Sequence, residues 1–198
     1  MHNPLCTITF ALMAEEDPRE ITELELLRSL AQPRRQQIVQ HLTAHGPATS
    51  AGLARALGLN TGATSYHLRE LARQGFIEEV PEKAHGRERW WRVVRRDVRF
   101  PRRADQDAPT RLALDEISRQ SLAADLDAYT RALAETQGGA WADLPYSRST
   151  ITVDHDRLRE FFEEYIALVN RFREAGGDGA RRVQLRFLAF PADPVKPG

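Results

Sequence analysis

Apolar side chains recur every three or four positions between residues 22 and 74, a spacing typical of helices that bury one face. The spacing is interrupted by residues that end or begin helices. Gly46-Pro47, Gly58 and Gly75 are expected to end helices, and Thr49 and Asn60 (or Thr61) are expected to begin them. The pattern therefore predicts four helices, at 22–31, 33–45, 50–57 and 61–74.

The pattern changes after Gly75. Residues 76–80 and 89–94 are short segments with alternating or β-branched and aromatic side chains, and the loop between them contains Gly86. These features predict two paired strands. A hairpin directly after the fourth helix would be the wing of a winged helix-turn-helix domain.

The two faces of the helix at 61–74 differ in chemistry. Its inward stripe consists of Thr64, Leu68, Leu71 and Ala72. The opposite face carries hydroxyls, a glycine, an aromatic ring and arginines, which are groups that suit phosphates and base edges in the major groove. A merely solvated helix in so charged a chain would usually present Glu and Lys instead. The residues predicted to contact DNA from this helix are Thr61, Gly62, Ser65, Tyr66, Arg69 and Arg73.

Basic residues are concentrated beside this helix. The chain has 28 Lys and Arg and 28 Asp and Glu, so its overall charge says nothing about partners. Between residues 81 and 103, however, nine basic residues accompany three acids. Taken alone, this strip is equally well interpreted as a solvated hairpin; beside a candidate recognition helix it favours a polyanion as partner. The wing residues predicted to contact DNA are Lys83, Arg87 and Arg89.

Residues 24–94 resemble the winged-helix domain of the ArsR family of bacterial transcriptional regulators. The resemblance lies in LRSLAQPRRQQIVQHL, in LARALGLNTGATSYHLRELARQGFIEE and in the wing segment GRERWWRVV. The run Ser65-Tyr66-His67-Leu68-Arg69 resembles the family's Ser-His-His-Leu-Lys run, with Tyr66 in place of the first His. The resemblance implies a homodimer that binds operator DNA and is released by an effector.

The chain departs from the metal-sensing members of that family. Residues 49–57 contain neither Cys nor His, and residues 109–137 contain acids but no His. Asp154-His155-Asp156 stands where a helix begins, so helix capping explains these residues without a metal. We therefore expect no metal site, no cofactor and no metal-dependent DNA binding.

The other histidines are weaker candidates for ligands. His41 and His45 share a helix face, but no third ligand accompanies them. We expect His67 to be a partly buried packing residue and His85 to lie in the wing loop, near phosphate or in solvent.

The second half of the chain predicts a helix at 109–137, a short strand at 150–153, a second helix with a broad apolar face, and a strand at 183–189 ended by Pro191. Leu122, Leu126, Tyr129 and Leu133 resemble a coiled-coil seam. We expect this helix, with the helix at 22–31, to form a two-fold dimer interface. The aromatic residues of this half are interpreted as core or dimer interface, with an apolar ligand pocket as the alternative: Trp141, Tyr146, Phe161, Phe162, Tyr165, Phe172, Phe187 and Phe190.

The expected fold class is mainly α with a small β component. The predicted division is a disordered or mis-assigned lead-in at 1–20, a winged helix-turn-helix domain at 21–96, a basic linker at 97–108 and a helical or α+β dimerisation or effector domain at 109–198. The lone Cys6 is compatible with a reducing cytoplasm, and no apolar run is long enough to span a membrane.

Three classes of function come into question. The sequence favours a sequence-specific transcriptional regulator, most simply a homodimeric repressor that binds double-stranded DNA at an inverted repeat. The alternative is a winged helix used for protein–protein contact, whose recognition face should be apolar or acidic. An enzyme is not expected, because no nucleophile–base pair, phosphate loop or metalloprotease motif is present. A small-molecule effector is left open, and no ligand is identified.

Overall fold

The computed structural model describes residues 19–83, 88–94, 98–135, 145–172 and 176–192. The chain divides into two compact units, Met1–Thr150 and Ile151–Gly198. In the described parts, no helix is both long enough and apolar enough to cross a membrane.

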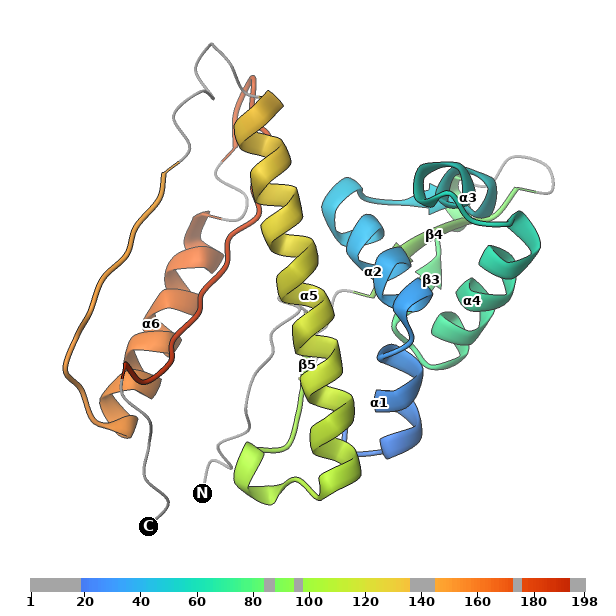
Figure 1. Cartoon of the computed structure of the whole chain (residues 1–198). Helices are drawn as coiled ribbons and strands as arrows, with labels where there is room; N and C mark the ends of the chain where they lie inside the picture. Colours follow the sequence, from blue (N-terminus) through green and yellow to red (C-terminus); the bar gives the residue numbers. More distant parts are fainter. Residues whose placement is uncertain (1–18, 84–87, 95–97, 136–144, 173–175, 193–198) are drawn as a thin grey trace. The chain divides into compact units, whose positions relative to one another are not determined.

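Four helices of the first unit occupy the positions that the apolar spacing predicts (Figure 1). Gln32 accepts a hydrogen bond from the Arg35 amide at the start of the second helix, and Thr49 accepts one from the Gly52 amide at the start of the third. These caps satisfy amides that a helix start leaves without partners. The four helices are α1 (Leu24–Leu30), α2 (Pro33–His45), α3 (Ser50–Leu57) and α4 (Thr61–Arg73).

The predicted wing is present as an antiparallel pair, β3 (Ile77–Glu79) and β4 (Trp90–Val93), with the short 3-10 helix η1 (Pro81–Lys83) after β3. A third strand, β2 (Ala48–Thr49), pairs with the other edge of β4, so the sheet order is β2-β4-β3. The sequence did not predict β2, because two residues are too few to show a period.

A second pair of strands joins two segments that lie far apart in the sequence. β1 (Arg19–Glu20) runs parallel to β5 (Val98–Arg99), and Ile21 continues the contact through its amide to the Arg99 carbonyl. The expected end of the lead-in at residue 20 therefore differs from the structure. Arg19 and Glu20, placed in the lead-in, are strand residues.

The segment 97–108 is not a simple basic linker. Within it, Val98 and Phe100 are buried in the core, and η2 (Arg103–Asp105) precedes the next helix. Burial of apolar side chains stabilises the folded chain, so this segment is part of the domain.

The long helix α5 (Ala108–Glu135) packs its first half onto α1 and α2. Thr110, Ala113, Leu114 and Ile117 are buried there, and Gln120 donates a hydrogen bond to the carbonyl of Ala31, 3.0 Å away. The compact unit thus extends beyond the boundary expected near residue 109. On α1, Leu27 and Leu30 are likewise buried within their own chain.

The second unit contains α6 (His155–Phe172), flanked by extended chain. The strands predicted at 150–153 and 183–189 are absent: both segments are described, and neither is paired in a sheet. A strand requires a neighbouring strand to accept its backbone hydrogen bonds.

Candidate nucleic-acid interface

The turn between α3 and α4 fixes the orientation of the two helices relative to each other. Gly58 adopts a left-handed conformation with φ of 62°, which glycine adopts without steric cost. Asn60 then caps α4 by accepting hydrogen bonds from the amides of Gly62 and Ala63 at 2.8 and 3.3 Å. The sequence predicted the role of Gly58, and it offered Asn60 as one of two starts for α4, with Thr61 as the other.

α4 buries the face that the sequence assigned to the core. Thr64, Leu68 and Leu71 are fully buried, and Thr64 also donates its hydroxyl to the Asn60 carbonyl. The opposite face is open: Tyr66 is 51% exposed, Ser65 is half-buried, and the remaining predicted contact residues on this helix, Thr61, Gly62, Arg69 and Arg73, are exposed.

Ser65 is tied to α3 through Ser50. The two hydroxyl oxygens are 2.7 Å apart, and the Ser50 hydroxyl also lies 3.4 Å from the Thr61 carbonyl oxygen. Ser50 therefore joins the start of α3 to the exposed face of α4. The sequence did not single it out, because the pairing is visible only when the two helices cross.

The arginines of α4 differ in their environment. Arg73 forms an ion pair with Glu70, 2.9 Å away, which raises the pKa of Arg73 and lowers the pKa of Glu70. Arg69 is exposed, and no hydrogen bond or ion pair joins it to another residue in the described part of the chain. Arg69 is thus the more available of the two cations for a ligand.

The basic residues of the wing are partly neutralised by acids of the same hairpin. Arg89 pairs with Glu79 at 3.0 Å and Arg92 with Glu78 at 2.7 Å, while the Lys83 ammonium lies 5.4 Å from the centre of the Trp90 ring. The Glu78 hydrogen bond raises the pKa of Arg92. Exposed pairs of this kind contribute about 0–1 kcal/mol, so a phosphate can replace the carboxylate. Arg87 and His85 lie outside the described residues.

The C-terminal end of α4 is joined to strand β1 through Arg19. Arg19 donates a hydrogen bond to the Gln74 carbonyl at 2.5 Å, and its guanidinium lies 5.4 Å from the Phe76 ring centre. Ser29 of α1 donates to the Gln74 side chain at 2.6 Å. These contacts join the end of α4 to β1 and α1, and no local pattern of residues predicts them.

The histidines show packing rather than chelation. His67 is half-buried, and its pKa is lowered by burial and by the charges of Arg35 and Arg34. The His41 and His45 rings lie 4.5 Å apart, and burial, followed by the charge of His45, lowers the pKa of His41. Within the described ranges, no three His, Cys, Asp or Glu residues gather as metal ligands would.

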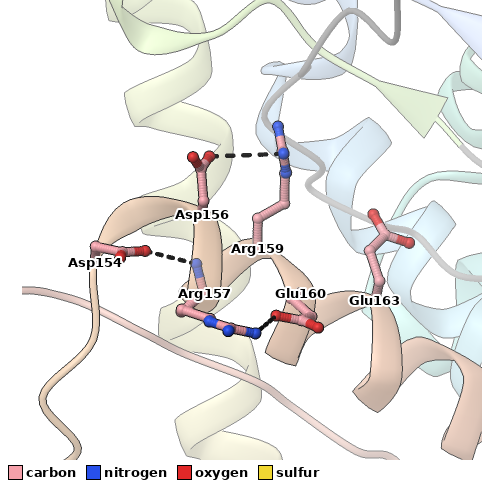
Figure 2. A pocket seen from close by; sticks show the side chains of 6 residues that line it. All are labelled: Asp154, Asp156, Arg157, Arg159, Glu160 and Glu163. Atoms are coloured by element: carbon pink, nitrogen blue, oxygen red, sulfur yellow. Dashed lines mark hydrogen bonds and ion pairs between the residues drawn. The ribbon is translucent and has the colours of Figure 1, made fainter.

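A polar depression of about 510 Å³ lies at the start of α6 (Figure 2). Several of its charged groups are joined to one another. Asp154 accepts a hydrogen bond from the Arg157 amide at 2.8 Å, Arg157 pairs with Glu160, and Arg159 pairs with Asp156. The capping role predicted for Asp154 is confirmed. The depression is lined by none of the aromatic residues considered for an apolar ligand pocket, the alternative interpretation of the sequence.

Those aromatic residues are divided between the two units. Phe187 packs against Phe161, Phe162 and Tyr165 of α6, with ring centres 5.0–5.8 Å apart. Tyr146 stacks on Tyr129 of α5 in the first unit. Phe172 and Phe190 are exposed, and Trp141 is outside the described residues.

A capped helix, a glycine turn, a second helix with an exposed polar face and a two-stranded wing together define a winged helix-turn-helix protein. Residues 30–80 match the helix-turn-helix domain family. Over this range the chain carries a helix-turn-helix domain, and the match supports a DNA-binding transcriptional regulator. The resemblance inferred from the sequence is confirmed over this range. No curated protein matches the chain.

Solved structures similar to this chain include regulators and a nucleic-acid-binding domain. Reduced HlyU from Vibrio cholerae is 20% identical, covers 48% of this chain and 82% of its own, and has a TM-score of 0.31. The transcriptional regulator Tm0710 from Thermotoga maritima is 12% identical, with coverages of 74% and 82% and a TM-score of 0.33. The Zα domain of Carassius auratus PKZ, solved with Z-DNA, is 17% identical, with coverages of 32% and 97% and a TM-score of 0.29. At these identities and TM-scores the neighbours say nothing about what this chain binds.

Proposed function

We propose that this regulator is a homodimeric repressor that binds an inverted-repeat operator through α4 and the wing. The observation that carries the proposal is the exposed face of α4, where hydroxyls, Tyr66 and an arginine without an ion pair to any described residue stand on a helix that is capped and buried on its other side. A repressor of this kind acts by occupying its operator.

In this proposal α4 enters the major groove with its first turns toward the bases. Thr61, Ser65 and Arg69 follow one another at four-residue intervals, so their side chains lie on one face of the helix. Arg69 reaches a guanine edge, and Tyr66 contacts an adjacent base or sugar. Arg73, Lys83, Arg87 and Arg89 hold the sugar–phosphate backbone on either side.

The dimer is proposed to form through the second half of α5. Leu126 is 64% exposed there, and the neighbouring Leu122, Tyr129 and Leu133 are exposed on the same helix. Exposed apolar residues at spacings of four, three and four form a seam that a second copy of the helix can cover. A two-fold axis would then present two α4 helices to half-sites about 10 or 20 base pairs apart.

These two surfaces assign DNA binding and dimerisation to different parts of the chain. Residues 21–96 carry the DNA-binding elements, and residues 109–198 carry dimerisation and any response to an effector. The first half of α5 connects the dimerisation part to the DNA-binding part, because it packs on α1 and α2. No effector is proposed.

The proposal is tested by incubating the full-length protein with the DNA upstream of its own gene and with a scrambled duplex at several salt concentrations. Retardation of the upstream fragment at lower protein concentration than the scrambled one, weakening as salt rises, supports it. Equal binding to both, or none to either, would favour the protein–protein interaction module. Footprinting of the retained fragment then shows whether the protected sequence is an inverted repeat.

A further inference from the structure

The second compact unit leaves its apolar residues uncovered. None of its described residues is buried, although the rings of Phe161, Phe162, Tyr165 and Phe187 cluster against one another. Val183, Leu185, Leu188 and Phe190 are each more than half exposed. A helix with a broad apolar face and an apolar extended segment normally bury those faces against another layer.

The segment 183–190 has the side-chain pattern of a strand but no strand beside it. Val183, Leu185 and Phe187 alternate with Gln184 and Arg186, and Pro191 ends the pattern. Figure 1 draws the segment (red) as a plain extended trace, and no sheet includes it. Backbone groups of an extended segment gain hydrogen bonds when a second strand lies alongside.

The described first unit offers no strand of suitable length. Its strands contain two to four residues, and β4 is already paired on both edges. A second copy of this chain, in contrast, supplies the same eight-residue segment. The described residues of the second unit, from 151 onward, carry nearly equal numbers of basic and acidic side chains. Two copies of this unit can therefore meet without strong electrostatic repulsion.

We propose that residues 183–187 pair antiparallel with the same residues of a second copy, forming a two-stranded ribbon across the two-fold axis of the dimer. Centring the register on Leu185 pairs the whole alternating stretch 183–187 with itself and keeps its apolar residues on one face. Leu185 then lies opposite itself, and Val183 lies opposite Phe187 of the second copy. On the other face, Gln184 lies opposite Arg186. The apolar face of the ribbon covers the ring cluster on α6.

This inference rests on the homodimer of the proposed function and adds a second contact to the α5 seam. It accounts for strand-like sequence in a segment that belongs to neither sheet of the described residues. The intermolecular pair would supply the β component that the sequence predicted for this half.

The test is disulfide formation in the full-length protein. In a Cys6→Ser background, Leu185→Cys should give a covalent dimer on mild oxidation, because directly opposite residues of an antiparallel pair have Cα atoms about 4.5–5.5 Å apart, within the range of a disulfide. Leu188→Cys is the matched control. Its own counterpart would lie about six residues along the ribbon, roughly 20 Å away, so it should remain monomeric on a denaturing gel.

The outcomes separate the two proposals. Sedimentation of the unmodified protein first shows whether a dimer exists; a monomer at all concentrations overturns both this inference and the homodimer. A dimer in which Leu185→Cys does not cross-link, or in which Leu188→Cys cross-links equally well, overturns the ribbon and leaves the α5 seam standing.

A second measurement does not depend on cysteine chemistry. Amide hydrogen exchange across 183–187 should be slowed about 100-fold or more in the dimer and should return to the unprotected rate on dilution to monomer. Protection that persists in the monomer would mean pairing within one chain and would overturn the inference. Leu185→Asp should weaken dimerisation about 10-fold or more, since it places two carboxylates opposite each other, whereas Gln184→Asp, which lies opposite Arg186, should not.

Discussion

The hydroxyl oxygens of Ser50 and Ser65 lie 2.7 Å apart where α3 crosses α4. The hydrogen bond joins the first residue of one helix to the exposed face of the next, so a residue predicted to contact DNA also positions the helix. We expect Ser50→Ala and Ser65→Ala each to lower the free energy of unfolding by about 0.5–1.5 kcal/mol. The double variant should cost little more than either single variant, as measured by urea denaturation.

The same pair of variants separates positioning from contact with DNA. If Ser65 only positions α4, both variants weaken operator binding equally. A larger loss for Ser65→Ala than for Ser50→Ala would show that the Ser65 hydroxyl itself contacts the DNA.

Arg69 is expected to determine base preference. Because it has no ion pair to break among the described residues, Arg69→Ala should cost about 1–3 kcal/mol of operator binding and relax preference at one base pair per half-site. Binding to operator and scrambled duplexes is the measurement. A parallel loss on both duplexes would mean that Arg69 holds a phosphate, and would leave Thr61, Ser65 and Tyr66 as the candidates for base contacts.

Arg89 is expected to contribute affinity without specificity. Arg89→Ala should weaken operator and scrambled DNA about equally and reduce the slope of log affinity against log salt by about one for each phosphate that the variant no longer neutralises. Glu79→Gln is the matched control, since it releases Arg89 from its 3.0 Å ion pair. This variant should bind both duplexes slightly more tightly; weaker binding would contradict the assignment of Arg89 to the backbone.

Leu126 is expected to be central to the dimer seam. It is 64% exposed in the single chain, so Leu126→Asp should fold normally but shift the protein toward monomer and abolish high-affinity operator binding. Ser118→Asp adds the same charge at an exposed polar position of α5 and should leave the dimer intact. Analytical ultracentrifugation checks both. A Leu126→Asp variant that stays dimeric would place the interface elsewhere.

His67 is expected to make the domain less stable in mild acid. Burial and two arginines lower its pKa from the ordinary 6.5, so the unfolded chain takes up a proton before the folded one does. Stability should therefore fall as the pH drops through 6.5 toward the lowered value. His67→Gln should reduce this dependence in thermal melts between about pH 7.5 and 5.5. His155→Gln, at a position largely exposed to solvent, is the control.

Local signals were enough to predict the winged helix-turn-helix region. The starts of α3 and α4 follow from Thr49 and Asn60, and the end of α3 follows from Gly58, because caps and turns depend on a few neighbouring residues. The exposed face of α4 follows from helical spacing alone, since Thr64, Leu68 and Leu71 must turn inward together.

Tertiary structure decided what connects these elements. The pairing of Arg19 with Val98, the hydrogen bond from Arg19 to Gln74 and the packing of α5 on α1 join residues far apart in the sequence. No local period encodes such contacts, because each depends on how the helices have already packed. For the same reason the strand-like alternation at 183–187 determined only which side chains share a face. Whether that segment becomes a strand depends on a partner strand, and none of the described residues of the single chain supplies one.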